Sequence, residues 1–424
     1  TGAMRRYQTD IENSNISAFN KTGIAFGRRE GQSIGIINSF TRHEIESAYG
    51  AKQYDGKQNT FYSNVLVSSF LVNETHKYVA GASFLYDRFD ETYSDTLAKN
   101  SVNTPMPIRL AREDIVPGAF AQYTYSFQEK LTVMAGVRGD YHNRYGMLFT
   151  PRANVKYNFT NDIIFRVSAG RGYRSANVIA ENIGYLASSR RMNVLAINDL
   201  DIEKAWNYGA NLTFYIHLPE ERTITVGMDY YRTDFDNQAI VDMEYDRQEI
   251  YFYNLQGKSY ANAWQMDVQA TPFKGFDVFA AFRLSDTRVT YSHNGQRFTA
   301  DKPLSSKFRG LLNFSYATNF EKWKIDVTAQ FNGSSRLPGL SEGGYSAAQE
   351  RSPAYPLYFA QITKKTKRLD IYAGCENILN YKQKNPIIEA NDPFGSIFDA
   401  SRIWGPLMGR KFYAGIRLRI GEIK

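Results

Sequence analysis

The stretch from Leu131 to His142 alternates, residue by residue, between two kinds of side chain. Its odd positions are mostly apolar and end in the aromatic Tyr141, whereas its even positions are mostly polar or charged and include Arg138 and Asp140. Successive side chains of a β-strand point to opposite faces, so one face of this strand would be apolar and the other polar. A repeat of this kind, carried over about ten residues in each segment, is typical of a transmembrane β-barrel.

The same alternation recurs along most of the chain, together with many aromatic residues. Aromatic residues make up 15% of the chain, with 30 Tyr and 28 Phe, and they often close the apolar face of a segment. These segments are roughly 12 to 16 residues long, whereas strands of soluble proteins usually have about six. A soluble β-sandwich also alternates, but the strand lengths, the aromatic ends and the basic residues on the polar faces favour a membrane barrel.

Short and long connections alternate along the sequence, as they do when strands run up and down around a barrel. Long connections are predicted at 91–113, 175–198, 334–353 and 381–408, and shorter ones on the same side include 11–16 and 48–59. The first strand is predicted at 4–10 and the last at 410–420. Counting back from the last strand, the sequence predicts an all-β fold, a transmembrane antiparallel β-barrel of about 18 strands.

The composition argues against an enzyme, a metal site and a nucleic-acid partner. No run of 18 apolar residues is present, so no transmembrane helix is expected. The single cysteine, Cys375, allows neither an internal disulfide nor a cysteine metal site. The five His residues are scattered, and no nucleophile has His and acid partners on a matching strand. The net charge of +8 is spread along the chain, so it is assigned to the lumen and the loops and no nucleic-acid partner is expected. No cofactor is expected either.

Five short motifs, in this order and spacing, resemble the barrel of TonB-dependent outer-membrane receptors. A Pro-Arg strand at 150–157 precedes a Gly-x-Gly-Tyr-Arg strand at 165–174. After a long connection, 200–209 opens on Glu203 and carries Asn-x-Gly, and the stretches 230–238 and 376–380 resemble later parts of the same barrels. The resemblance covers at least Ala119 to the C-terminus.

The resemblance implies active transport across a bacterial outer membrane, with no bond made or broken. The cargo would be a large, scarce nutrient, with an iron–siderophore complex or a related metal chelate as the leading class and a glycan or cobalamin as the alternative. The implied partners are the inner-membrane energy-coupling protein TonB, outer-membrane lipid, the small-molecule or metal-chelate ligand and, in some systems, a surface lipoprotein.

The front of the sequence departs from that family, because nothing in it resembles the TonB-recruiting motif or the plug domain. We therefore expect residues 1–424 to form the larger C-terminal portion of a barrel of about 22 strands, with the plug and roughly four strands absent. The alternative is a self-contained passive porin of eighteen strands, in which the strand at 4–10 pairs with the strand at 410–420. An open gap between those two strands would refute that alternative.

Basic side chains dominate the polar strand faces that would line the lumen. They outnumber the acids there, and most are expected to hydrogen-bond a plug and one another, while some could draw in an anionic ligand. The predicted lumen residues are Arg138, Arg152, Lys156, Arg166, Arg174, Lys307, Arg309, Arg417 and Arg419, with the acids Asp140, Asp229, Asp267 and Asp326.

Ligand contacts are predicted in the long connections and at the top of the lumen, where aromatic and basic residues lie close in sequence. Such pairs suit a planar or aromatic anion through stacking and charge, although they also suit ordinary loop packing. The candidate ligand-binding residues are Arg174, Tyr185, Arg190, Arg191, Tyr345, Arg351, Arg402 and Trp404.

Overall fold

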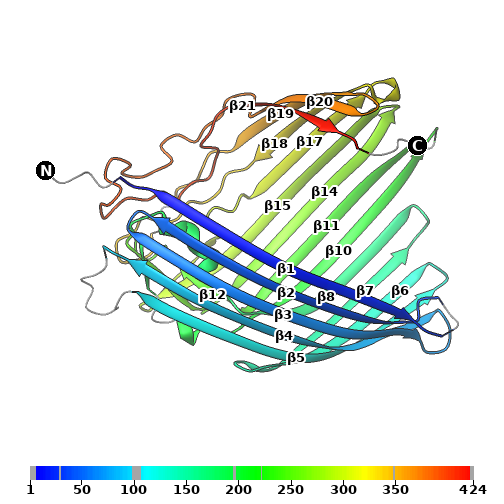
Figure 1. Ribbon diagram of the computed structural model, residues 1–424, viewed down its shortest axis with the longest axis horizontal. Coiled ribbons are helices and arrows are strands. Elements are labelled where there is room, and N and C mark those ends of the chain that lie inside the picture. The colour runs from blue at the N-terminus through cyan, green and yellow to red at the C-terminus, as the bar shows by residue number, and fades with distance from the viewer. Residues whose placement is uncertain are drawn as a thin grey trace.

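More than half of the chain folds into one large antiparallel sheet that curls around a central space (Figure 1). The computed structural model describes residues 6–27, 30–97, 107–193, 197–220, 222–346 and 349–420. The strands of this sheet are β1 (Thr9–Ala25), β2 (Ser33–Tyr49), β3 (Lys52–Phe70), β4 (His76–Asp95), β5 (Ile108–Phe127), β6 (Leu131–His142), β7 (Gly146–Asn158), β8 (Ile163–Arg174), β10 (Glu203–Leu218), β11 (Arg222–Asn237), β14 (Ser259–Phe273), β15 (Phe276–His293), β16 (Gln296–Asp301), β17 (Phe308–Ala317), β18 (Trp323–Asn332), β19 (Tyr355–Lys365), β20 (Leu369–Glu376) and β21 (Lys411–Leu418).

The described residues form a sheet of 18 strands, in agreement with the predicted number of about 18, and consecutive strands of the sheet pair antiparallel except β16 and β17, which do not pair with each other. β16 and β17 both pair with β15, so they are two segments of one interrupted strand. In the described part of the chain, β1 pairs only with β2 and β21 only with β20. The pairing between first and last strands that a self-contained porin requires is therefore not seen, and Figure 1 shows β1 and β21 at opposite edges of the curled sheet.

Rows of side chains that face each other across the strands show that the wall has two chemically different faces. One row is polar through most of the sheet and contains Lys156, Arg166, Asn211, Asp229, Gln265, Arg283, Arg309 and Asn332. The adjacent row is offset by one residue on each strand and therefore points to the opposite face. It is apolar and contains Val155, Val167, Ala210, Tyr230, Trp264, Leu284 and Phe308. Such a wall can face hydrocarbon on one side and water on the other.

The register also identifies which face lines the interior. Tyr54 and Tyr93 lie opposite each other on β3 and β4, and the connecting segments inside the mouth bury both of them. Following the register from these two residues around the sheet places the predicted lumen residues on the inner face, with the exception of Lys307. Lys307 lies in the connection between β16 and β17 and pairs with Asp301 at 2.9 Å.

Three predicted connections are wrong or too long. The segment 11–16 lies inside β1, which pairs with β2 without a break, so the separate first strand at 4–10 is wrong for its described residues, while Met4 and Arg5 lie outside them. The predicted connection 48–59 shrinks to Gly50 and Ala51, with Gly50 in the left-handed region at φ 61°. The predicted connection 91–113 begins only after β4 ends at Asp95. Polar residues occupy both odd and even positions in these stretches, so the sequence predicted loops there.

The outer face of β2–β4 changes from apolar to charged at a definite row. Phe40, Phe61 and Tyr86 lie side by side across the three strands, and Phe40 and Phe61 are exposed. The next row on the same outer face, two residues closer to the long connections, contains Arg42, Asn59 and Arg88. An aromatic row followed by charges marks the edge of an apolar band, so the strand ends beyond it project out of that band.

The long connections fold over the mouth of the sheet and form a compact layer, which we call the cap (residues 175–202, 238–258, 333–354 and 377–410). It contains the 3₁₀ helices η1 (Ala180–Leu186) and η2 (Ile197–Asp199) and a small sheet of β9 (Arg191–Asn193), β12 (Ala239–Asp242) and β13 (Glu249–Asn254). Buried residues of the cap pack on the inner wall: Val178, Ile179, Leu186, Met192, Leu200, Met243, Ile250 and Phe252. The short η3 (Asn319–Glu321) lies at the opposite end of the strands. In the described residues no helix has the length and apolar character needed to cross a membrane.

Candidate ligand-binding site

Arg190 is the centre of the cap, because its buried guanidinium joins three connections that are far apart in sequence. The residue is 1% exposed. Its Nη1 donates to the carbonyl of Met243 at 2.9 Å, and its Nη2 donates to the carbonyl of Gly339 at 3.1 Å. Its Nε donates to a carboxylate oxygen of Asp399 at 3.4 Å. A buried cation is tolerated only when it is paired and hydrogen-bonded, and these partners satisfy that requirement.

Lys52 ties this centre to the strand ends. It opens β3 beyond the aromatic row of the outer face, and its Nζ donates to the carbonyl of Ser188 at 2.6 Å and to the carbonyl of Arg190. Burial lowers the pKa of Lys52 to about 8, although the nearby carboxylates of Asp95 and Asp399 oppose the shift. The amine therefore donates hydrogen bonds that join the strand end to the cap, and it loses its proton more readily than an exposed lysine does.

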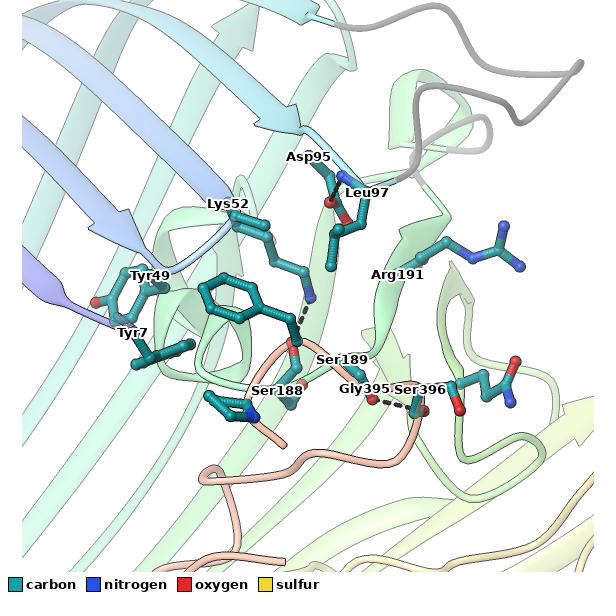
Figure 2. Close-up of a pocket in the computed structure, with 14 residues that line it drawn as sticks. Tyr7, Tyr49, Lys52, Asp95, Leu97, Ser188, Ser189, Arg191, Gly395 and Ser396 are labelled. Atoms are coloured by element: carbon teal, nitrogen blue, oxygen red, sulfur yellow. Dashed lines mark hydrogen bonds between the residues drawn. The ribbon is translucent and has the colours of Figure 1, made fainter. Parts of the chain in front are cut away.

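A cavity of about 440 Å³ opens beside Lys52, between the β2–β3 turn, the end of β4 and the cap (Figure 2). Tyr7, Tyr49 and Phe394 give it aromatic walls, and Tyr7 lies 6.0 Å from Phe394 between ring centroids. Hydrogen bonds from Ser189 Oγ to the Ser396 carbonyl (2.8 Å) hold one side of the cavity in place.

The charged groups of this cavity favour an anion. Lys52 and Arg191 contribute two positive charges and Asp95 one negative charge. Asp95 is 2% exposed and accepts a hydrogen bond from the backbone N–H of Leu97 at 3.0 Å, so its charge is partly satisfied within the protein. Arg191 is about half exposed and pairs with Glu249 at 2.8 Å. Glu249, which is not a lining residue, balances the charge of Arg191. The aromatic walls and the basic groups of Lys52 and Arg191 on the lining are the features that suit a planar or aromatic anionic ligand.

The family model "TonB dependent receptor-like, beta-barrel" matches residues 4–378 of this sequence. The chain belongs to this family. Among curated proteins, none matches the sequence. The family model spans the motifs at 150–157, 165–174 and 200–209, so the resemblance seen in the sequence is confirmed.

Solved structures of TonB-dependent receptors share the fold of this family member. The siderophore receptor PiuA from Acinetobacter baumannii superposes with a TM-score of 0.65 at 12% identity, covering 97% of this chain and 64% of that chain. The ferric-catecholate import receptor Fiu from E. coli K12, in a closed form, gives the same figures. The copper transporter OprC gives a TM-score of 0.66 at 10% identity, covering 96% of this chain and 66% of that one. The chain thus spans 64% of the length of the first two receptors, and at these identities the likeness shows the fold alone.

Two of the predicted ligand residues lie where the wall of this TonB-dependent receptor-like barrel meets the cap, Arg174 at the end of β8 and Tyr185 in η1. Arg174 and Tyr185 line a smaller cavity of about 190 Å³. The guanidinium of Arg174 is already held by Glu203 at 2.7 Å and Glu181 at 3.0 Å. Burial raises the pKa of the Tyr185 hydroxyl, and the charge of Arg190 opposes that shift.

The other predicted residues are spread over the cap. Arg191 lines the cavity of about 440 Å³ beside Lys52, which we call the large cavity. The guanidinium of Arg190 is already bonded to Met243, Gly339 and Asp399. Tyr345 donates to the buried carboxylate of Asp242 at 2.7 Å. Burial alone would raise the pKa of Asp301, but hydrogen bonds from Lys307 and Arg351 lower it overall.

Arg402 and Trp404 lie further along the last long connection. Arg402 lines a third cavity beside residues 337–341. The Trp404 carbonyl accepts a hydrogen bond from the Tyr355 hydroxyl at 3.0 Å, and the two rings lie 5.7 Å apart. The eight predicted residues are therefore distributed over several places rather than gathered into one site.

The residues that line the large cavity were mostly missed by sequence analysis. Tyr7 was placed in a first strand, and Tyr49 and Lys52 in the shorter connection 48–59, whereas the structure brings them together with Phe394. Their only signal is a Tyr-Gly-Ala-Lys turn at 49–52, which becomes informative once the turn is known to have two residues.

Proposed function

We propose that the protein is an outer-membrane transport receptor that takes up a metal chelate, with an iron–siderophore complex as the leading class, in a step energised by TonB. The family membership supports the transport role, and the two-faced wall supports insertion into a membrane. The cavity beside Lys52 carries the proposal about the ligand, because its aromatic walls and basic groups fit an anionic chelate with aromatic parts.

Several relatives of known fold favour this cargo class. PiuA and Fiu are described as siderophore or ferric-catecholate receptors, another structure is the ferric citrate transporter FecA, and OprC is described as a copper transporter. We infer the same kind of metal-bearing ligand here, and no covalent step. A glycan or cobalamin is the alternative cargo, and the serine and glutamine side chains on the cavity wall, such as Ser189 and Gln248, would serve it.

The cap also supports gated uptake over passive diffusion. Its residues Val178, Leu186 and Phe252 pack into one buried cluster with Tyr54 and Tyr93 of the wall. A mouth filled in this way would have to rearrange before a large ligand could pass, and TonB-driven transport supplies work for such a change. This mechanism leaves the chain no chemical role beyond binding, orienting and releasing the ligand.

The natural full-length protein in detergent should bind ferric siderophores, and Phe394→Ala should weaken binding by about tenfold because one stacking wall is lost. Isothermal titration with ferric catecholate, ferric hydroxamate, cobalamin and an oligosaccharide checks this. Phe320→Ala is a matched control, since Phe320 is 93% exposed at the opposite end of the strands. Tight binding of the oligosaccharide with no binding of either chelate would overturn the proposed cargo, and uptake in cells lacking TonB would overturn the energised step.

A further inference from the structure

The third cavity, of about 290 Å³, lies in the cap away from Lys52. Residues 337–341 form one side, Arg336 and Glu244 close another, and Glu350 and Arg402 complete the lining. No residue that lines the large cavity also lines this one. The two cavities are therefore separate places on the cap.

The two arginines of this third cavity differ in how fully they are paired. Arg336 donates from Nη1 and Nη2 to the two carboxylate oxygens of Glu244 at 2.8 and 3.1 Å, and from Nε to the Asp301 carbonyl at 2.6 Å. Every edge of that guanidinium thus has a partner. Arg402 is 8% exposed, yet only its Nη2 has a carboxylate partner, an oxygen of Glu350 at 2.6 Å.

Two residues that line this cavity each have a buried polar atom with no partner among the described residues, namely Nε of Arg402 and Oγ of Ser341. A buried donor without a partner costs free energy, and the cost is larger for a charged group. Nε and Nη2 lie on the same edge of a guanidinium and together match the two oxygens of one carboxylate. Glu350 uses only half of that edge, and its side chain is 63% exposed, so water competes for its carboxylate.

We propose that this cavity binds a small carboxylate, which displaces Glu350 and takes both Nε and Nη2 of Arg402, with the Ser341 hydroxyl as a third donor. Because Glu244 is held by Arg336, displacing Glu350 leaves Arg402 as the one unpaired positive charge among the described lining residues. A single negative charge is therefore matched. A phosphate dianion would bring a second negative charge close to Glu244, so it is disfavoured.

The volume of the cavity suits a carboxyl group on a short chain or single ring. The same chemistry is found in a free organic acid and in the C-terminal carboxylate of a peptide. This binding does not depend on the proposed transport function, because it concerns a separate cavity and is measured without uptake.

The test is a ligand-observed NMR titration of the natural full-length protein in detergent with benzoate, succinate, inorganic phosphate, and one short peptide with a free or an amidated C-terminus. Benzoate or succinate should bind, and phosphate should not compete with either. The peptide should bind only when its C-terminus is free. Glu350→Gln should tighten binding by about two- to fivefold, since an exposed competing ion pair is lost. Arg402→Lys should weaken it by about tenfold or more, because a lysine cannot offer the paired edge.

Matched controls exist in the same region, where Arg247 pairs with the 77% exposed Glu342 at 3.4 Å. Glu342→Gln and Arg247→Lys should leave carboxylate binding unchanged. The proposal is overturned if Glu350→Gln leaves binding unchanged or weakens it while the protein keeps its thermal unfolding midpoint. It is equally overturned if phosphate displaces benzoate, or if the two controls alter binding as much as the variants of the cavity do.

Discussion

The 424-residue chain, refolded on its own into detergent micelles or lipid vesicles, should not form a stable membrane-inserted barrel. β1 has 17 residues and pairs only with β2 among the described residues, and β21 pairs only with β20. Roughly half of the backbone N–H and C=O groups along β1 therefore point away from any neighbour. In hydrocarbon each such group costs several kcal/mol, so the edges together disfavour insertion by tens of kcal/mol.

Protease protection and circular dichroism after refolding into vesicles check this expectation. The matched comparison is the natural full-length protein under the same conditions, which should be protected. If the isolated chain gave a monomeric, protease-resistant β-structure, the unpaired edges would be shown not to matter, and the proposal that further strands close the ring would fail.

The direction of the strands limits what can close such a ring. β16 and β17 both pair with β15 and can be counted as one interrupted strand, which leaves 17 strands in the series. Neighbouring strands run in opposite directions, so the first and the seventeenth, β1 and β21, run in the same direction. An antiparallel ring then requires an odd number of closing strands. We propose that five strands, rather than the four expected from the sequence, complete a ring of 22.

The sequence predicts the wall well where the two faces see different solvents. β6 and β18 alternate cleanly, because an apolar residue facing hydrocarbon and a polar one facing water cannot be exchanged without cost. The prediction fails where strands extend beyond the apolar row, as in β1 and the first residues of β3. There both faces meet water, polar residues are allowed on each, and the period of two is lost.

The site was harder to predict because its contacts are assembled from distant segments. Arg190 was rightly noticed as a basic residue in a long connection, but nothing in the sequence shows that its partners are the backbone carbonyls of Met243 and Gly339. Carbonyl acceptors have no sequence signature, since every residue carries one. Lys52 and Phe394 are 342 positions apart, and only the folded cap brings them to one cavity.

Replacing Arg190 with methionine should release the cap from the wall without unfolding the barrel. Methionine keeps much of the length of the side chain but leaves the carbonyls of Met243 and Gly339 and the carboxylate of Asp399 without their donor. Removing one partner from a buried ionic network costs about 3–5 kcal/mol, and the cost should appear as easier local opening. Hydrogen exchange in the natural full-length protein should then speed up at residues 239–246, 337–341 and 396–400, with the strands β10 and β11 unaffected.

The neighbouring residue provides the control for this prediction. Arg191 carries the same charge, but its side chain is 46% exposed and pairs with Glu249 alone, so Arg191→Met should change local opening by less than about 1 kcal/mol. Equal effects of the two substitutions would mean that positive charge in general, rather than the buried contacts of Arg190, holds the cap. Faster exchange confined to residues next to Arg190 would mean that the three connections open separately. With that second outcome, the cap could not move as one unit when a ligand passes.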